Sequence, residues 1–358
     1  IMRKFYLIAL ASISMFACSK NDSQESTDIP SEGIVFELAT VNKLENGITS
    51  RTRPLYSQEA IQEVERVSIL AFKKSGNDYL YDTTYVVPNW SKGSTFMRFT
   101  IEPLNRLQKT DYQFLVVGRE LTDNYTLATL TRGTSKITDV TATVPTPGQE
   151  SEIFAGDKSV TVSSEGVRVS IEMTRKIAGI LGYFKNVPAM IGSDNVKSLR
   201  LVMTNADKQV NLYSGIGSTP TATDYEVFNI DLSGQTVTPE GVFAGSDLSG
   251  QGVVKVANSQ LTGKFVLPVS NITMQLRLYG ATNNILKSWN VLNSGNVTMD
   301  ILANHFYALG QKVTKGDTTG GGTPDTGDDD APIDLLKDQV IAITINPNWA
   351  QFHNLVIQ

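Results

Sequence analysis

The sequence contains few of the residues that metal sites and thiol chemistry require. Its 358 residues include one cysteine and two histidines. One thiol cannot form a disulfide within the chain, and so few cysteines and histidines exclude a zinc site built from them and a Cys–His catalytic pair. We therefore expect no disulfide framework, no metal and no cofactor.

The chain also lacks an excess of positive charge. It has 31 basic and 36 acidic residues, a net charge of −5. Proteins that bind nucleic acid need a basic face that displaces counterions from phosphate, so no nucleic-acid partner is expected. Hydrophobic residues make up 41% of the chain, which is enough for a buried core.

Catalytic motifs are missing as well. There is no Ser-centred elbow and no HExxH motif. His305 and His353 have no matching ligand or thiol nearby in the sequence, and we interpret them as structural or surface residues. The carboxylates of residues 317–330 do not have the spacing of a calcium loop and indicate a solvated acidic loop. The sequence leaves paired carboxylates for glycoside hydrolysis open without indicating them, and we predict that the protein is not an enzyme.

The beginning of the chain has the layout of a bacterial export signal. Arg3 and Lys4 precede an apolar run from Phe5 to Ala17, which is too short for a stable membrane span. The run ends in Met-Phe-Ala-Cys, which is similar to a lipobox. We predict a lipoprotein signal peptide over residues 1–17 and lipidation of Cys18, with an ordinary signal that contains a cysteine as the alternative.

Acyl chains on Cys18 would attach the exported protein to a membrane. Each buried methylene contributes about 0.8 kcal/mol, and two or more chains anchor stably where one does not. Residues 18–32 are polar and nearly free of large apolar groups, which is typical of a flexible tether.

The rest of the chain is made of short apolar runs separated by turn residues. Runs that alternate apolar and polar residues predict strands, and the Gly, Asn, Asp and Pro between them predict turns. The sequence therefore predicts an all-β protein with a β-sandwich architecture. The predicted strands are 67–72, 112–118, 158–162, 166–171, 199–203, 265–269, 272–278, 297–301 and 340–345.

The length of the chain predicts about two domains, at roughly 150 residues each. We place the division near Met173, so that residues 33–172 form an N-terminal and residues 173–358 a C-terminal β-sandwich domain. Residues 315–331 are rich in glycine and aspartate and are interpreted as a mobile linker.

A first distinctive segment lies at the start of the N-terminal domain. Within Gly33–Ser50, the residues Ile34, Phe36 and Leu38 alternate with others in a strand pattern, and Arg51-Thr-Arg-Pro follows. An arginine-directed protease could cut after Arg51, whereas Pro54 protects the bond after Arg53. An ordinary first strand followed by a polar loop is the alternative.

The second distinctive segment is the tail of residues 340–358. Ile341, Ile343 and Ile345 share one face of a predicted strand, and Leu355 and Ile357 resume the pattern after an Asn-Pro-Asn break. A strand behind a flexible linker can fold back as an edge strand of its own sheet. It can also complete the sheet of another molecule.

The three tryptophans support a different function. Trp90, Trp289 and Trp349 would form a platform for sugar rings if they were exposed. Alternating strand positions more often place aromatic rings in the core. A surface glycan-binding lipoprotein that uses Trp90 or Trp289 therefore stays as an alternative function.

The mature part of the chain resembles the fimbrillins, which are the lipoprotein-derived subunits of type V pili. The resemblance depends on the order of several degenerate motifs along the chain. These motifs are the lipobox at Cys18 and residues 48–53, 64–72 with 79–81, 173–179, 302–310 and 345–349.

The resemblance implies two transthyretin-like β-sandwich domains in tandem. It implies proteolytic removal of the first strand, within residues 33–53, by a cut at Arg51 or Arg53. The tail 340–358 of a neighbouring subunit then fills the vacated groove as a donor strand. Pro54 departs from the family pattern and disfavours Arg53 as the cut site.

The resemblance also implies a location and partners. The chain is expected at the surface of the cell outer membrane, held there by lipid on Cys18 before processing, and then in the fimbrium. Other fimbrial subunits are the expected partners, together with a host or bacterial surface receptor. The subunit is expected in the stalk or at the tip, and the alternative role is a membrane-retained anchor that keeps its lipid and first strand.

Overall fold

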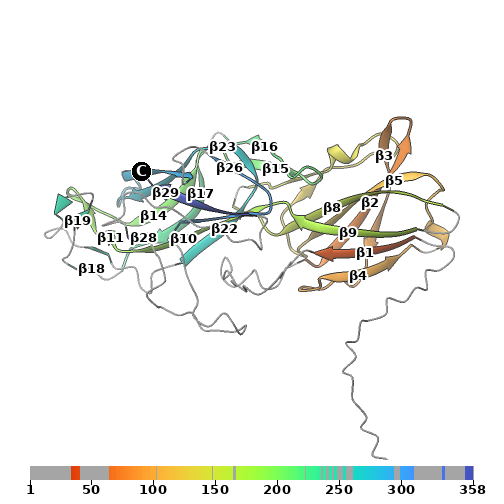
Figure 1. The fold of residues 1–358 in the computed structure, drawn as a ribbon. Helices are drawn as coiled ribbons and strands as arrows, with labels where there is room; N and C mark the ends of the chain where they lie inside the picture. Colours follow the sequence, from red (N-terminus) through yellow and green to blue (C-terminus); the bar gives the residue numbers. More distant parts are fainter. Residues whose placement is uncertain are drawn as a thin grey trace, which may run out of the picture.

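A computed structural model of the chain shows an elongated molecule in which two β-rich halves lie end to end (Figure 1). One half is formed by residues 34–175 and the other by residues 178–357. The structure describes residues 34–40, 64–101, 103–146, 148–163, 167–221, 223–234, 237–238, 242–243, 246–247, 253–254, 261–293, 299–309, 333–334 and 351–357.

The first half is built around a seven-stranded sheet with the order β3-β2-β5-β8-β9-β1-β4. Two 3-10 turns, η1 (Pro103–Asn105) and η2 (Ile137–Asp139), accompany it. The strands are β1 (Ile34–Thr40), β2 (Arg66–Ser75), β3 (Asp78–Val87), β4 (Phe96–Thr100), β5 (Asp111–Arg119), β8 (Ile153–Thr161) and β9 (Val167–Arg175).

The central strands β2 and β5 are covered on both faces, which explains why their sequences are almost continuously apolar. One face of each strand packs into a core shared with β9. This core contains Val67, Ile69 and Ala71 of β2, Tyr112, Phe114 and Val116 of β5, and Val169, Ile171 and Met173 of β9. The opposite face, which includes Phe72 and Leu115, belongs to a second core.

The second half is built around a nine-stranded sheet. Eight of its strands follow the order β17-β14-β24-β25-β29-β27-β10-β22, and β28 pairs with β10. The strands are β10 (Ala178–Lys185), β14 (Ser198–Met203), β17 (Tyr225–Asp231), β22 (Leu261–Val266), β24 (Met274–Tyr279), β25 (Ile285–Asn293), β27 (His305–Leu309), β28 (Ile333–Asp334) and β29 (Gln351–Ile357).

A third core fills the second half between these strands. Its fully buried side chains include Ile180 and Phe184 of β10, Leu199 and Leu201 of β14, Ile230 of β17, Leu276 and Leu278 of β24, and Tyr307 and Leu309 of β27. The sheet therefore folds over its own apolar face, as in a β-sandwich. The predicted all-β sandwich class is confirmed.

Shorter strands complete the described part of the fold. The pairs β11 (Val187–Pro188) with β21 (Val253–Val254), and β21 with β18 (Val237–Thr238), form a three-stranded sheet. Three two-stranded sheets join β12 (Met190–Ile191) to β13 (Asp194–Asn195), β19 (Val242–Phe243) to β20 (Ser246–Asp247), and β23 (Val269–Ile272) to β26 (Met299–Ile301).

The two halves repeat one strand topology. Read in chain order, strands β1, β2, β3, β4, β5, β8 and β9 occupy the same places as β10, β14, β17, β22, β24, β25 and β27. The directions agree as well, since β1 is parallel to β9 and antiparallel to β4, and β10 is parallel to β27 and antiparallel to β22. Two strands of the nine-stranded sheet, β28 and β29, have no counterpart in the first half, and of these β29 lies within the strand order.

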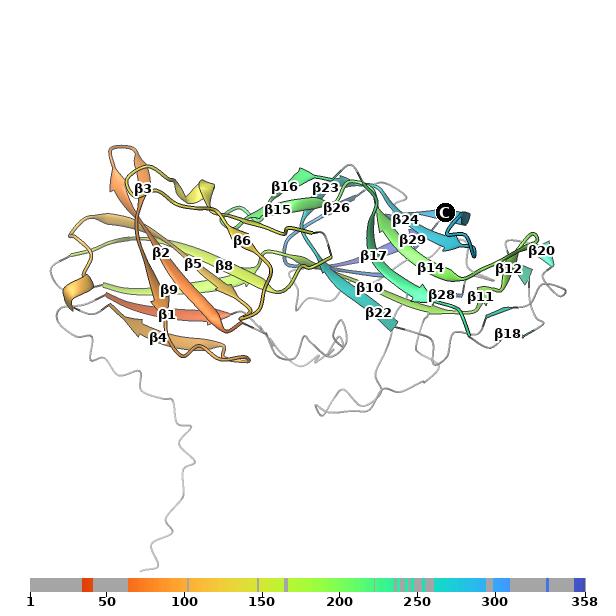
Figure 2. The same cartoon turned by 180° about the vertical axis from the view of Figure 1, so that it is seen from behind.

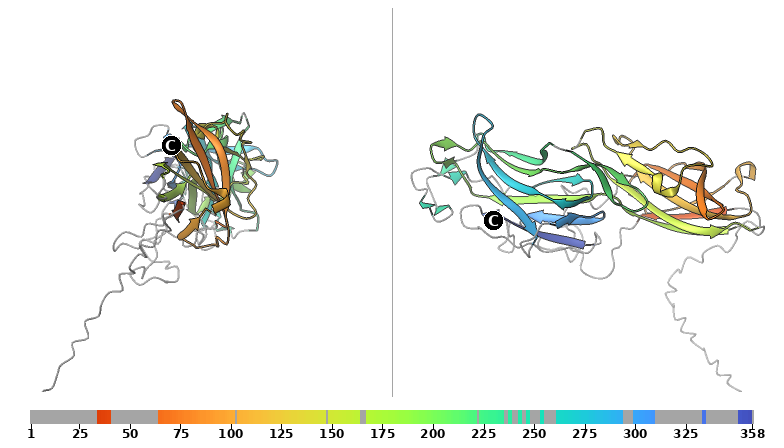
Figure 3. Two further views of the ribbon diagram at one scale, coloured as in Figure 1. Left: turned by 90° about the vertical axis from the view of Figure 1, so that its right-hand side faces the viewer. Right: turned by 90° about the horizontal axis from the view of Figure 1, so that it is seen from above.

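A small sheet and a shared core join the two halves. The sheet has the order β16-β15-β7-β6, in which β6 (Thr126–Leu127) and β7 (Thr141–Thr143) come from the first half. Its other strands, β15 (Asp207–Asn211) and β16 (Gly217–Pro220), come from the second half (Figure 2). Beneath it, Phe72 and Ile153 share a core with Val210 and Leu212. Figure 3 shows the resulting continuous rod from its end and from above.

The predicted domain division near Met173 falls close to the change of sheet. β9 ends at Arg175 and β10 begins at Ala178. Because backbone pairing between β7 and β15 and a hydrophobic core both cross this point, a division into two independent domains stays a prediction.

Most of the predicted strands are present, and one is divided. Strands occur at the predicted places from residue 67 to residue 203 and again over residues 274–279 and 299–301. The predicted strand 265–269 is wrong in its extent, because β22 ends at Val266 and β23 begins at Val269, on either side of Pro268. Proline has no N–H to donate to a ladder, which explains the interruption. Residues 340–345 lie outside the described residues.

A buried ion pair holds the end of β9 against the start of β8. Arg175 Nε donates to Glu152 Oε1 over 2.8 Å, and both side chains are almost completely buried. The Arg175 guanidinium also lies 4.9 Å from the centre of the Phe154 ring. The ion pair is thus fixed at the junction between the two halves, where charges without partners would be costly.

Replacing Glu152 by alanine should destabilise the protein by about 3–5 kcal/mol, because Arg175 would stay buried without its carboxylate. The matched control is Asp78→Ala, which removes an exposed ion pair with Lys136 (2.9 Å) and should cost at most about 1 kcal/mol. Urea unfolding measures both values. Equal effects of the two substitutions would contradict this assignment.

A second buried carboxylate connects the loop before β8 to the second half. Glu150 Oε2 accepts hydrogen bonds from the Gly148 N–H (2.8 Å) and the Tyr225 hydroxyl (3.1 Å). Burial raises the pKa of Glu150 above its ordinary value, and these hydrogen bonds and Lys264 only partly oppose the rise. The carboxyl group therefore binds its proton more tightly in the folded than in the unfolded chain.

This raised pKa predicts a pH-dependent stability. Below the ordinary value of 4.5 the favourable contribution of Glu150 is fully present, and it is lost as the pH rises through the folded-state pKa. Glu150→Gln should remove this loss. As the pH rises above 4.5, the free energy of unfolding of the variant should therefore increase relative to that of the native protein. The control is Glu172→Gln at an exposed position of β9. A difference that does not change with pH would show that Glu150 does not titrate in this way.

Candidate assembly strands

The first described strand, β1, is inserted between two strands that come later in the chain. It pairs in parallel with β9 over its whole length and antiparallel with β4. The strand predicted from the alternation at residues 34–39 is therefore present. Its place is inside the sheet, so that hydrogen bonds hold both of its edges.

The register of β1 sets it between two strands that border the first core. Phe36 is opposite Val169 of β9 and Phe99 of β4, and Leu38 is opposite Ile171 and Met97. Val169 and Ile171 are buried in the core, and Met97 and Phe99 pack against it. Loss of β1 would thus leave two unpaired strand edges beside an apolar core.

The last described strand, β29, is likewise an inner strand. Val291, Leu292 and Asn293 of β25 pair antiparallel with Ile357, Val356 and Leu355. On the other side, β27 pairs in parallel, with His305 opposite Gln351 and Ala308 opposite Asn354. The described end of the tail thus folds back into its own sheet, as the alternative to donation expected, but as an inner strand rather than an edge strand, because a strand lies on each side of β29.

The strands next to β29 contribute to the core of the second half. Val291 of β25 and Phe306, Tyr307 and Leu309 of β27 are almost completely buried. The Tyr307 hydroxyl donates to the Asp300 carbonyl (3.0 Å) and accepts from the Leu302 N–H (2.9 Å), which fixes the turn before β27. Burial raises the pKa of Tyr307 further above its ordinary value, so the hydroxyl keeps its proton at neutral pH.

The topology indicates which strand is additional. In the first half, β8 pairs directly with β9 through Phe154–Arg175 and Ala155–Thr174. In the second half, the equivalent strands β25 and β27 are separated by β29. Sequence alternation did not reveal this difference, because it gives the faces of a strand and not its neighbours.

Several residues singled out in the sequence lie outside the described residues. These are the lipidation candidate Cys18, the processing candidates Arg51 and Arg53, and the donor candidates Ile341, Ile343 and Ile345. Leu355 and Ile357 are described and belong to β29. The acidic segment 317–330 and Trp349 also lie outside.

The predicted sugar platform is not formed by the described tryptophans. Trp90 is buried in the first core and Trp289 in the core of the second half, with 5% and 7% of their surfaces exposed. The prediction that Trp90 or Trp289 stacks on sugar rings is therefore wrong. These residues follow the usual tendency of strand aromatics to fill the core.

The histidines lie on neighbouring strands. His305 begins β27, and burial lowers its pKa below its ordinary value. His353 lies in β29 opposite Tyr307. Among the described residues, no three His, Cys, Asp or Glu side chains gather into a possible metal site.

The described ranges also hold no helix that is long and apolar enough to cross a membrane.

Comparison with known families identifies the class of this all-β protein. The family model of the fimbrillin-A associated anchor proteins Mfa1 and Mfa2 matches residues 47–281, which is more than half of the chain. The chain therefore belongs to this family, and the predicted fimbrillin-type relationship is confirmed. The family is structural rather than enzymatic and is associated with fimbriae at the cell surface.

Solved structures show distant likenesses. One is a candidate polysaccharide-binding protein from Bacteroides thetaiotaomicron, with 13% identity and a TM-score of 0.44 over 72% of this chain and 79% of that chain. A candidate adhesin from Bacteroides ovatus has 16% identity and a TM-score of 0.44 over 74% and 79%. The fimbrial anchor protein Mfa2 from Porphyromonas gingivalis has 12% identity and a TM-score of 0.41 over 72% and 81%. A comparison with curated proteins gives no match.

Deletion of residues 340–358 should expose the edges of β25 and β27 and lower the melting temperature. A synthetic peptide of residues 351–357 should then raise it again in a concentration-dependent way, because the peptide binds only the folded protein. Differential scanning fluorimetry measures the shift, with the reversed-sequence peptide as control. A truncated protein that melts like the full chain would contradict the role of β29 in the sheet.

Proposed function

We propose that the chain is a structural subunit of cell-surface fimbriae that joins its neighbours by exchange of terminal strands. Membership of the fimbrial anchor family supports the association with fimbriae. The observation that carries the strand exchange is the additional strand β29, which has no place in the topology that the two halves share.

The tail is suited to donation because the fold of one half exists without such a strand. In the first half, the equivalents of β25 and β27 pair with each other directly. The second half therefore inserts β29 into a strand order that the first half forms without such a strand. In the single chain, β29 occupies its own sheet, and in a fibre the tail 340–358, with Ile341, Ile343, Ile345, Leu355 and Ile357, is supplied to a neighbour.

The first strand is suited to removal because a single stretch of chain connects it to the rest. β1 ends at Thr40, and the next described residue is Val64. A cut after Arg51 would leave β1 held by non-covalent contacts alone. Each ladder hydrogen bond contributes about 1 kcal/mol net, whereas association from solution costs about 4–15 kcal/mol. Because β1 is paired along both edges, the cut strand would leave by exchange with a donor strand that makes the same contacts.

A second role, a membrane-retained anchor, is favoured by the family's own description. In this role the protein keeps the lipid on Cys18, stays at the outer membrane, and retains β1 between β9 and β4. The anchor then donates or accepts a strand at one end only. Other fimbrial subunits are the partners in both roles, and a surface receptor is a partner only for a subunit at the tip.

The mature N-terminus distinguishes the two roles. A polymerising subunit purified with fimbriae should begin at Thr52, and Arg51→Ala should block processing and remove the subunit from the fibres. An anchor should begin at acylated Cys18 and be unaffected by Arg51→Ala. Mass spectrometry identifies the mature N-terminus, and electron microscopy with immunogold labelling shows whether the subunit is present in the fibres.

Two further variants serve as controls for this experiment. Arg53→Ala should change nothing, because Pro54 protects the bond that follows Arg53. Cys18→Ala should abolish acylation in either role. A protein that neither purifies with fimbriae nor alters their number or attachment when residues 340–358 are deleted would refute the proposed function.

A further inference from the structure

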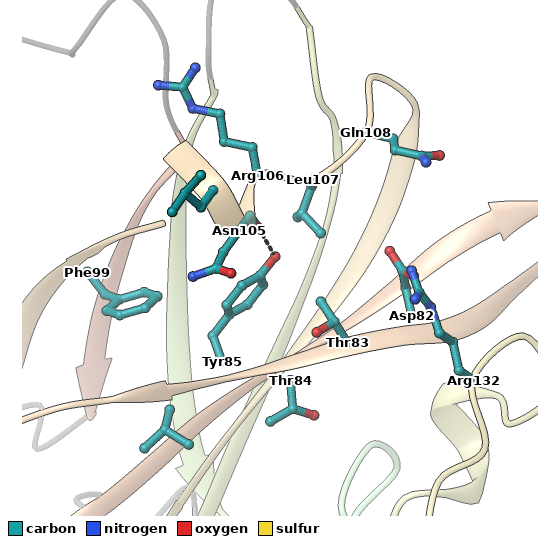
Figure 4. Close-up of a pocket in the computed structure, with 12 residues that line it drawn as sticks. Asp82, Thr83, Thr84, Tyr85, Phe99, Asn105, Arg106, Leu107, Gln108 and Arg132 are labelled. Atoms are coloured by element: carbon teal, nitrogen blue, oxygen red, sulfur yellow. Dashed lines mark hydrogen bonds and ion pairs between the residues drawn. The ribbon is translucent and has the colours of Figure 1, made fainter. Parts of the chain in front are cut away.

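The first half contains an open groove that none of the assembly strands occupies. It has a volume of about 610 Å³, which is within the usual range for small-ligand sites. β3, Phe99 of β4, the η1 segment and Arg132 line it (Figure 4). The two edge strands of the seven-stranded order, β3 and β4, meet here, with the Tyr85 and Phe99 ring centres 6.3 Å apart.

One end of the groove carries a carboxylate and a guanidinium side by side. Arg132 Nε and Nη2 both donate to Asp82 Oδ1, at 2.8 and 2.5 Å. Asp82 Oδ2 lies 3.5 Å from the Tyr112 hydroxyl, which is the limit of a hydrogen bond. The second oxygen of Asp82 thus keeps capacity to accept a hydrogen bond from a ligand.

The charges of this pair balance each other, and their exposure differs. The Asp82 side chain is 13% exposed and forms part of the groove wall, whereas the Arg132 side chain is 76% exposed. The remaining N–H donors of Arg132 therefore face the solvent beside an acceptor. A neutral ligand with adjacent hydroxyl groups can donate to the carboxylate and accept from the guanidinium at once.

The middle of the groove holds a fixed aromatic ring. Tyr85 is half-buried, and its hydroxyl donates to the Asn105 carbonyl over 2.8 Å (Figure 4). Burial raises the pKa of Tyr85 to about 12, so this hydrogen bond persists at physiological pH. A ring that is held in place binds a flat apolar face at little cost in conformational entropy.

Amide and hydroxyl groups line the remainder. Gln108 lines the groove, and its side-chain oxygen accepts from Lys73 Nζ at 2.5 Å. Thr83, Thr84 and Asn105 add further polar groups. Leu104 and Val86, with 98% and 71% of their surfaces exposed, form an apolar rim.

We propose that this groove binds a neutral carbohydrate. A pyranose ring has an apolar face that stacks on an aromatic ring, and its edges carry adjacent hydroxyl groups. The groove has a group for each of these features. The fixed ring of Tyr85 matches the apolar face, and the acceptor Asp82 with the donor Arg132 matches the adjacent hydroxyl groups. A peptide strand would need a row of unpaired backbone groups and apolar pockets, whereas this groove is lined mainly by polar side chains.

A printed array of neutral, sialylated and sulfated oligosaccharides tests the proposal with the intact protein. The native protein should bind neutral oligosaccharides. Isothermal titration with the best of them should show a loss of affinity of about tenfold or more in Asp82→Asn and in Tyr85→Ala. Tyr85→Phe keeps the ring and should lose less.

The matched control is Asp78→Asn on the same strand. Asp78 also forms an ion pair, with Lys136, but it does not line the groove, so this variant should bind as the native protein does. Urea unfolding confirms that the variants are folded. A native protein that binds no oligosaccharide on the array would overturn the proposal, as would equal affinity of the native protein and the two groove variants. Binding restricted to sialylated or sulfated sugars, lost in Arg132→Ala and retained in Asp82→Asn, would also overturn it.

Discussion

The architecture of this protein depends on the need of a strand edge to have its backbone N–H and C=O groups paired. In each half, a strand from one end of the described chain meets this need. β1 covers the edges of β9 and β4, and β29 covers the edges of β25 and β27. Both are inner strands, and both lie far in the sequence from their partners. Removal or transfer of either strand would therefore leave two unpaired strand edges, to which a strand of another molecule could bind.

The two halves are less separate than their repeated topology indicates. The backbone pairing of β7 with β15 crosses between them, and so does a core that contains Leu115, Ile177 and Leu212. The Glu152–Arg175 ion pair and the Glu150–Tyr225 hydrogen bond lie at the same junction. Rotation of one half against the other would expose this core. The two halves therefore keep a fixed orientation relative to each other.

The sequence predicted the strands wherever one residue pattern determines them. The apolar runs of β2 and β5 identified these strands, because residues buried on both faces have few alternatives to a central position. The break at Pro268 was missed because the run 265–269 is apolar throughout and was interpreted by its apolar pattern alone, although the proline in it already signals a missing donor.

Features that depend on distant partners could not be predicted in this way. The inner position of β29 requires β25 and β27 as neighbours, and no local pattern encodes them. The positions of the tryptophans in the sequence did not reveal their exposure, and Trp90 and Trp289 are buried in the structure. The groove residues Asp82, Phe99 and Arg132 come from three separated segments without a common motif, so only the fold brings them together.

The two-sided pairing of β29 also has a mechanical consequence. Tension along the axis of this strand loads both of its ladders in shear, because all hydrogen bonds to β25 and β27 must break together. Tension across the axis would instead open the bonds one after another at a much lower force. The last described strand is therefore held more firmly against a pull along its axis than against a pull across it.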